Sequence, residues 1–152
     1  MPHKLQALDL WRNVLVSSVK QAGPDLSSRQ LALLLTVYLT PPPHTVRGLA
    51  GTLSISKPAI SRALDRLGRL GFVRRKRDDA DRRNVLVQRT VKGSVFLTEF
   101  SQLVLTSQQA AMTEAVAGAG AGTGPADGPA DIQPYPLLED ASNELVLAGP
   151  PD

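Results

Sequence analysis

The chain has 152 residues, of which 42% are apolar, enough for one small domain with a hydrophobic core. It contains no Cys, which excludes disulfides, thiolate metal sites, cysteine nucleophiles and thiol redox sensing. Its longest nearly apolar run, residues 31–39, is about half as long as a membrane span, and its N-terminus lacks the charged and apolar blocks of a signal peptide. We therefore expect a soluble cytoplasmic protein.

The net charge of +3 hides a strong polarisation along the chain. Residues 44–92 carry thirteen basic and four acidic side chains, a net charge of +9, whereas residues 93–152 carry eight acidic and no basic ones. Arg outnumbers Lys in the basic block, and guanidinium groups suit the recognition of phosphate and guanine. The block favours a polyanion, with nucleic acid as the first candidate and a solvated basic face without a partner as the alternative.

The start of the chain predicts an amphipathic helix over residues 4–22, because apolar side chains recur there at every third or fourth position. Its apolar stripe consists of Leu5, Leu8, Trp11, Leu15, Val19 and Ala22. The pair Gly23 and Pro24 ends this helix.

A second helix is predicted to begin at Ser27, since Ser27 and Gln30 have the spacing of a capping box. Residues 31–39 are apolar on nearly every side, so we expect this helix in the middle of the fold. The prolines at positions 41–43 end it, because proline lacks the amide hydrogen that a helix needs.

Two short helices joined by a tight turn are predicted next, the first capped by Thr45 and the second by Ser56. The inner stripe of the second helix is Ile60, Ala63, Leu64, Leu67 and Leu70. At about 100° per residue, its opposite side presents Pro58, Ser61, Arg62, Asp65 and Arg69.

The period then changes from helix to strand. Gly71 suits the position after a helix, and residues 72–77 and 85–89 predict two strands around a charged tip at residues 78–84. The result is a β-hairpin.

A last helix is predicted over residues 91–117, capped by Thr90. It would be about 40 Å long, too long for so small a core to bury, so we expect it to pair with the first helix and with a second chain. From residue 118 onward, 35 residues include six Gly, six Pro and six Ala but no Lys or Arg, which predicts a disordered acidic tail.

This order of elements is the winged helix-turn-helix arrangement, and the residues from about 26 to 93 resemble the MarR family of bacterial transcriptional regulators. Residues 56–67 and 71–75 are similar to the family's recognition helix and first wing strand. Asp78-Asp79-Ala80-Asp81-Arg82-Arg83, with Val87 and Thr90-Val91-Lys92-Gly93, is similar to its wing pattern, Asp-Pro-x-Asp-Arg-Arg and Val-x-Leu-Thr-x-x-Gly. Asp79 replaces the usual Pro and Arg89 the usual Leu, and the tail stands where the family usually has a second C-terminal dimerisation helix.

The expected fold is therefore mainly α with a small β-wing, a winged helix-turn-helix with flanking dimerisation helices. The expected parts are an N-terminal dimerisation helix in residues 1–25, a DNA-binding domain in residues 26–92, a C-terminal dimerisation helix in residues 93–117 and the tail in residues 118–152.

The resemblance implies a sequence-specific regulator that binds double-stranded DNA, a homodimer that acts as a repressor. Family members commonly respond to small aromatic or lipophilic ligands in a crevice between the dimer and DNA-binding regions. Two alternatives remain open. One is a winged-helix module that binds a protein, with the acidic tail as a docking or autoinhibitory segment, and the other is an architectural DNA binder indifferent to sequence.

The recognition helix enters the major groove with its first half. The side chains best placed there are Lys57, Pro58, Ser61 and Arg62. At the hairpin tip are Arg82 and Arg83, and the resemblance favours Arg83 for a narrow A·T minor groove. Phosphate-contact candidates are Thr45, Arg47, Arg69, Arg74, Arg75 and Lys76. We expect Asp65 and Asp81 to orient arginines, since a carboxylate beside phosphate is repelled.

No catalytic constellation is visible in the sequence. The two histidines, His3 and His44, lie far from any suggestive partner, and no carboxylate pair sits on an apolar face. The cluster of Asp78, Asp79 and Asp81 is a poor metal site, because its basic neighbours oppose a cation. We predict no enzyme, no cofactor and no metal.

Overall fold

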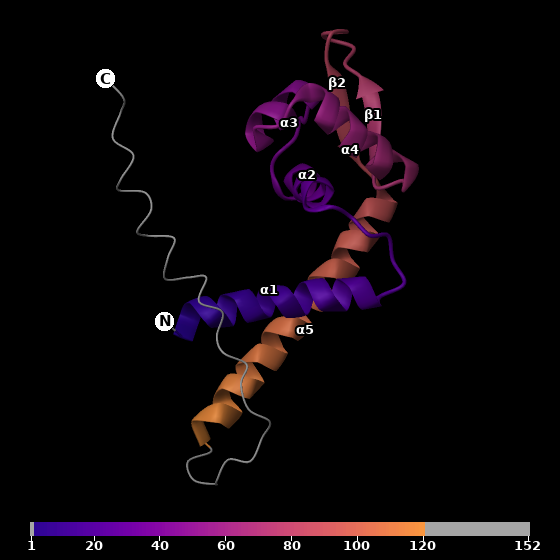
Figure 1. Ribbon diagram of the computed structural model, residues 1–152. Helices are drawn as coiled ribbons and strands as arrows, with labels where there is room; N and C mark the ends of the chain where they lie inside the picture. Colours follow the sequence, from indigo (N-terminus) through magenta and orange to yellow (C-terminus); the bar gives the residue numbers. More distant parts are fainter. Residues whose placement is uncertain (1, 121–152) are drawn as a thin grey trace, which may run out of the picture. The chain divides into compact units, whose positions relative to one another are not determined.

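The computed structural model describes residues 2–120, which form five helices and one two-stranded antiparallel sheet (Figure 1). In chain order the elements are α1 (Pro2–Lys20), α2 (Ser28–Leu39), α3 (Val46–Leu53), α4 (Lys57–Arg69), β1 (Val73–Arg77), β2 (Val85–Arg89) and α5 (Val91–Gly120). The predicted mainly α fold with a small β-wing is confirmed. The last helix runs three residues further than predicted, and the predicted tail lies outside the described residues from residue 121 onward.

The predicted helix caps are present and explain where the helices begin. The Ser27 hydroxyl accepts a hydrogen bond from the Gln30 amide at 3.2 Å, and the Gln30 side chain accepts one from the Ser27 amide at 3.0 Å, which completes the capping box of α2. The Thr45 hydroxyl caps α3 by accepting a hydrogen bond from the Gly48 amide, and the Ser56 hydroxyl caps α4 by accepting one from the Ala59 amide. Gly71 follows α4 with a φ of 76°, a left-handed conformation that glycine adopts without steric cost.

The hydrophobic core lies among α2, α3, α4 and the base of the hairpin. Its fully buried side chains include Leu33, Leu34, Val37, Leu49, Ile60, Leu64 and Leu67. The position of α2 in the middle of the fold and the inner stripe of α4 are as predicted, although Leu70 at the end of that stripe is only partly buried.

The hairpin is attached to this core at its base. Its strands pair from Val73 with Arg89 to Arg77 with Val85, and Val73 and Val87 are buried. The segment before α3 also joins the hairpin, because the Val87 amide donates to the His44 carbonyl at 2.8 Å. Beyond Val73 every residue of β1 is exposed, so the outer part of the hairpin stands in solvent.

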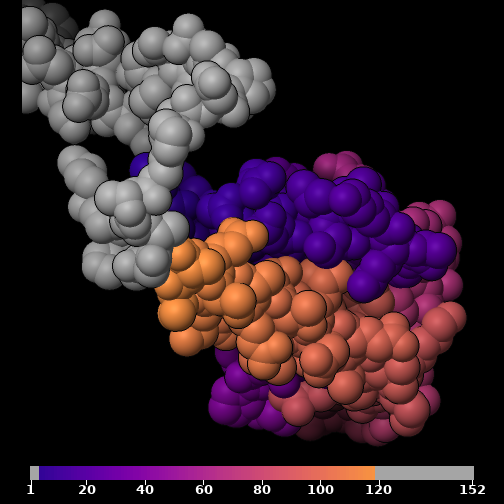
Figure 2. Space-filling model, turned by 90° about the horizontal axis from the view of Figure 1, so that it is seen from below, coloured from indigo at the N-terminus to yellow at the C-terminus, as the bar shows by residue number. Residues whose placement is uncertain are grey.

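Helix α1 packs mainly against α5, and Figure 2 shows the two helices side by side. Val14 of α1 and Leu103 and Ser107 of α5 are buried. None of the helices in residues 2–120 combines the length and the hydropathy that a membrane span requires.

The apolar stripe predicted for the first helix does not face the core of its own chain. The exposed fractions are 60% for Leu5, 56% for Leu8, 50% for Trp11, 43% for Leu15 and 77% for Val19. Helix α1 also ends at Lys20, so Ala22 lies beyond it. The periodicity identified an amphipathic helix correctly, but the described residues leave most of this stripe exposed.

Candidate nucleic-acid interface

Helix α4 presents its polar side to solvent because its apolar stripe is held in the core. Lys57, Pro58 and Arg62 are exposed on its first two turns, and Ser61 is half-buried beside them. Ser56 fixes where the helix starts, so these four side chains project from a defined helix N-terminus. Asp65 and Arg69 are exposed further along the same side.

The start of α4 and the hairpin enclose a shared hollow of about 260 Å³. It is lined by Val46, Arg47, Lys57, Ser61, Arg75, Arg83, Asn84 and Val85. We call this feature the basic hollow, because four of its eight residues are Arg or Lys. Predicted base-contacting residues from the helix, predicted phosphate-contacting residues and one arginine of the wing tip therefore lie around one concavity.

Not every predicted residue belongs to the basic hollow. Arg62 is exposed on α4 and Arg82 is exposed at the tip, and neither lines the hollow. Arg74 lines a different depression with His44 and donates a hydrogen bond to the Gln88 side chain at 3.1 Å. The separation of Arg74 from Arg75 follows from the strand period, which points successive side chains to opposite faces.

Thr45 and Lys76 already have partners within the chain. The Thr45 hydroxyl accepts a hydrogen bond from the Gly48 amide at 2.9 Å as the cap of α3. The Lys76 ammonium lies 3.9 Å from the Asp79 carboxylate, at the limit of an ion pair. Thr45 is half-buried, whereas Lys76 is exposed and retains donors for a further acceptor.

The two aspartates expected to orient the arginines of the wing tip contact other groups. Asp65 forms an ion pair with Arg75, which joins α4 to β1 at the basic hollow. Asp81 accepts a hydrogen bond from the Arg83 backbone amide at 3.1 Å, so it orders the main chain that carries Arg83. Among the described residues, neither carboxylate forms an ion pair with the guanidinium of Arg82 or Arg83.

The acidic residues of the tip build its turns. The Asp78 carboxylate accepts a hydrogen bond from the Ala80 amide at 2.9 Å, just as Asp81 does from Arg83. Such contacts from Asp to a backbone amide two residues further on are typical of tight turns. Within residues 2–120 no group of three His, Asp or Glu side chains is arranged to hold a metal ion.

Arg89 and Tyr38, which meet at the base of the hairpin, were not singled out as functional by the sequence. Arg89, at the end of β2, donates hydrogen bonds to the Val37 carbonyl at 2.9 Å and to the Thr40 carbonyl at 2.8 Å. Its guanidinium also lies 5.9 Å from the centre of the Tyr38 ring. The one signal in the sequence was that Arg89 stands where the MarR-like pattern has Leu.

A second depression, of about 320 Å³, lies between the end of α1 and the start of α5. Phe72, Phe96 and Phe100 line it together with Lys92 and Glu99, and we call it the aromatic crevice. The Phe72 and Phe96 rings stack with their centres 4.5 Å apart. Phe72 immediately precedes β1, so the crevice adjoins the base of the hairpin.

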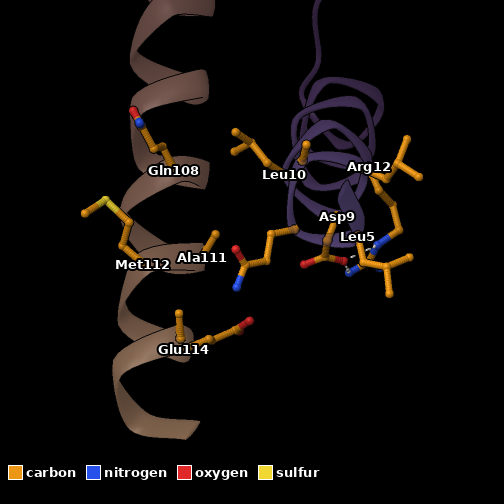
Figure 3. A pocket seen from close by; sticks show the side chains of 12 residues that line it. Leu5, Asp9, Leu10, Arg12, Gln108, Ala111, Met112 and Glu114 are labelled. Atoms are coloured by element: carbon orange, nitrogen blue, oxygen red, sulfur yellow. Dashed lines mark hydrogen bonds and ion pairs between the residues drawn. The ribbon is translucent and has the colours of Figure 1, made fainter. Parts of the chain in front are cut away.

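An apolar groove of about 890 Å³ lies between the first half of α1 and the second half of α5 (Figure 3). Leu5, Leu8, Leu10, Ala111 and Met112 supply its apolar surface. Polar side chains also line it, among them Arg12, which forms an ion pair with Asp9 at 2.6 Å. The groove is continuous with the exposed stripe of α1.

Helices α3 and α4 with the hairpin behind them define a winged helix-turn-helix. Residues 26–85 match the model of the MarR family. The match spans the recognition helix, the first wing strand and the wing tip, which are the parts whose residues resemble the family.

Solved structures share this fold over about three quarters of the chain. A MarR structure is 23% identical and covers 75% of this chain and 83% of its own, with a TM-score of 0.57. A MarR mutant from E. coli is 28% identical over the same shares, with a TM-score of 0.56. A MepR mutant from S. aureus, bound to an oligodeoxyribonucleotide, is 18% identical, covers 73% of this chain and 79% of its own, and has a TM-score of 0.62. No curated protein sequence matches the chain.

Proposed function

We propose that this protein is a transcriptional regulator that binds double-stranded DNA through α4 and the hairpin. The observation that carries this proposal is the basic hollow, in which Lys57 and Ser61 of the helix lie around the same concavity as Arg83 of the wing. A helix fits the major groove of B-DNA, and an arginine suits a narrow minor groove because of its negative potential. The phosphate backbone between the two grooves would then lie over the hollow.

In this arrangement the base edges are read by Lys57, Pro58, Ser61 and Arg62. Arg62 is suited to the O6 and N7 acceptors of guanine, and Pro58 to a thymine methyl group. Arg83 enters the minor groove, and Arg82 binds phosphate. The main-chain turn that Asp81 stabilises keeps Arg83 at the tip.

Phosphate contacts come from Thr45, Arg47, Arg69, Arg74, Arg75 and Lys76. Arg47 and Arg75 line the hollow, and the Asp65 carboxylate holds Arg75 in place. These contacts supply affinity and register without sequence information.

We further propose that the protein is a homodimer joined through α1 and α5, and that it represses transcription by covering promoter DNA. The support for dimerisation is the apolar surface that one chain leaves exposed, namely the α1 stripe and Leu105, Met112 and Val116 of α5. Apolar patches of this kind mark interaction surfaces. A two-fold dimer would place its half-sites about one helical turn apart.

The aromatic crevice favours a small aromatic or lipophilic ligand as the effector of this regulator. The partly exposed Phe96 and Phe100 rings offer stacking surfaces, and Lys92 and Glu99 supply one positive and one negative charge for polar substituents. Because Phe72 lies beside the hairpin, a ligand there would act on the wing.

The test is a titration of duplex DNA binding against salt concentration. If about six to ten phosphates are neutralised, log K falls against log salt with a slope near −0.9 for each of them. A duplex selected from random sequence should also bind much more tightly than random duplex. Equal affinity for both duplexes would indicate an architectural binder, and absence of binding would favour the protein-interaction module.

A further inference from the structure

The Arg89 side chain connects the end of β2 to the end of α2. The last carbonyls of a helix have no partner within the helix, and they form the negative end of its dipole. The guanidinium of Arg89 donates to two carbonyls in this region, at 2.9 and 2.8 Å, and thus supplies both hydrogen bonds and positive charge. These hydrogen bonds join residues 52 and 49 positions apart in the sequence.

Tyr38 makes a second connection at the same place. Its hydroxyl accepts a hydrogen bond from the Thr90 amide at 2.8 Å. The same oxygen lies 2.8 Å from the Phe72 carbonyl and 3.0 Å from the Thr90 carbonyl, either of which can accept its proton. One hydroxyl therefore contacts both the residue before β1 and the residue after β2.

The packing around this hydroxyl leaves no spare room. A side-chain carbon at Gly93, in the first turn of α5, would collide with the Tyr38 hydroxyl and with the Phe72 carbonyl oxygen. The Tyr38 ring in turn lies beneath the Arg89 guanidinium. The base of the hairpin is thus fixed against α2 and α5 by a small number of specific contacts.

The outer hairpin has fewer contacts with the rest of the chain. Among the described residues, they include the isolated bridge between Thr45 and Leu86 and the ion pair between Arg75 and Asp65. Four of the five β1 residues are exposed, and a two-stranded hairpin is at best marginally stable by itself. From Arg89 to Val85, strand β2 spans four steps, or about 13 Å, and Arg83 lies beyond it at the tip. A tilt of about 10° at the base would therefore move the tip by at least about 2 Å, which is about a third of the width of the minor groove.

We propose that Tyr38 and Arg89 form a clamp that sets the angle of the wing relative to the recognition helix. They are positioning residues, because they act through Arg83 rather than by touching DNA. Arg89 thereby becomes a determinant of sequence specificity, although its guanidinium is engaged with the protein. This inference rests on the proposed function.

Salt dependence separates this role from a direct phosphate contact. The wild-type chain is first used to select a duplex from random sequence, and binding of that duplex and of random duplex is measured for wild type, Arg89→Leu, Arg89→Lys and Tyr38→Phe. The clamp predicts that Arg89→Leu weakens the selected duplex about tenfold, changes random duplex by less than about twofold and leaves the salt slope unchanged. Tyr38→Phe should behave in the same way, and Arg89→Lys should fall between Arg89→Leu and wild type.

A phosphate contact at Arg89 would give a different result. Both duplexes would weaken by the same factor, and the slope would fall by about 0.9. That outcome, or unchanged affinity for the selected duplex, overturns the clamp while leaving the proposed function intact. Lys20→Leu, which removes one exposed charge from α1, is the control for net charge. Failure of wild type to bind any duplex would instead reject the proposed function.

A distance measurement without DNA tests the wing angle directly, even if a variant binds DNA poorly for a reason unrelated to the wing. Because the chain has no Cys, spin labels can be placed at Ala80→Cys on the wing tip and Arg29→Cys on α2, both exposed. The clamp predicts a narrow distance distribution that becomes broad when Arg89→Leu or Tyr38→Phe is added. An unchanged distribution in both variants contradicts it.

Discussion

The winged helix and the pair formed by α1 and α5 differ in how they satisfy their apolar residues. In the winged helix, the side chains that the sequence patterns directed inward, such as Leu33, Ile60 and Leu64, are completely buried within one chain. In α1 the patterned stripe is exposed, with Trp11 at 50% and Leu8 at 56%. Among the described residues, the first region covers its patterned apolar side chains, whereas the second leaves most of its patterned stripe exposed.

The largest effect should come from the core of the winged helix. Leu64→Ala should lower the free energy of unfolding by about 2–5 kcal/mol, because Leu64 is fully buried and the substitution leaves a cavity. Leu8→Ala, measured in urea on the dissociated chain, should cost less than about 1 kcal/mol, since Leu8 is mostly exposed there. Similar losses for the two variants would remove the contrast between the regions.

The next largest effect concerns the surface that one chain leaves uncovered. Trp11→Glu places a charge in the α1 stripe and should weaken dimerisation by about 2 kcal/mol or more, as expected for a central interface aromatic. Sedimentation velocity measures the dimer, and circular dichroism should show that the winged helix remains folded. Thr52→Glu on the exposed side of α3 is the matched control. A Trp11→Glu chain that dimerises as well as wild type would contradict the proposed interface.

DNA affinity should change by a smaller amount at single positions. Arg83→Ala and Arg62→Ala should each lose about 1–3 kcal/mol, or roughly 10- to 100-fold, of affinity for the selected duplex. The control is Arg29→Ala, which removes an exposed guanidinium from α2. Fluorescence anisotropy with labelled duplex measures all three variants, and equal loss of affinity in Arg83→Ala and Arg29→Ala would argue against a role for the wing.

The smallest expected effect is on stability and concerns the capping box at the start of α2. Ser27→Ala removes the hydroxyl that caps α2 and should cost about 1 kcal/mol, which corresponds to a fall in Tm of about 4–8 °C for a domain of this size. The adjacent Ser28→Ala, in the first helical position, should change the Tm much less. If both variants melt like wild type, the capping box does not stabilise α2.

The sequence predicted the features that depend on near neighbours. The caps at Ser27, Thr45 and Ser56 and the left-handed Gly71 follow from residues a few positions apart, and all are present. The sequence could not predict that the α1 stripe would be exposed. A helical period shows that one side of the helix is apolar, but it does not show what that side packs against.

In the candidate site, too, features set by nearby residues were predictable and contacts between distant residues were not. Lys57 and Ser61 follow from the period of α4, but their meeting with Arg83 across the basic hollow requires the fold. The contacts of Tyr38 and Arg89 join positions about fifty residues apart, which no pattern in the sequence encodes. The opposite directions of Arg74 and Arg75 were available from the strand period.

The most direct test of the central claim is affinity cleavage, in which a DNA-cleaving reagent is attached to the wing tip at Ala80→Cys in this Cys-free chain. The account predicts cuts confined to the minor groove beside each half-site of the selected duplex, at two positions related by two-fold symmetry. The same reagent at Val116→Cys, near the far end of α5, should give no such cuts. A uniform cleavage pattern from the wing tip, or the same pattern from both labels, would contradict the claim that α4 and the wing hold one DNA backbone between them.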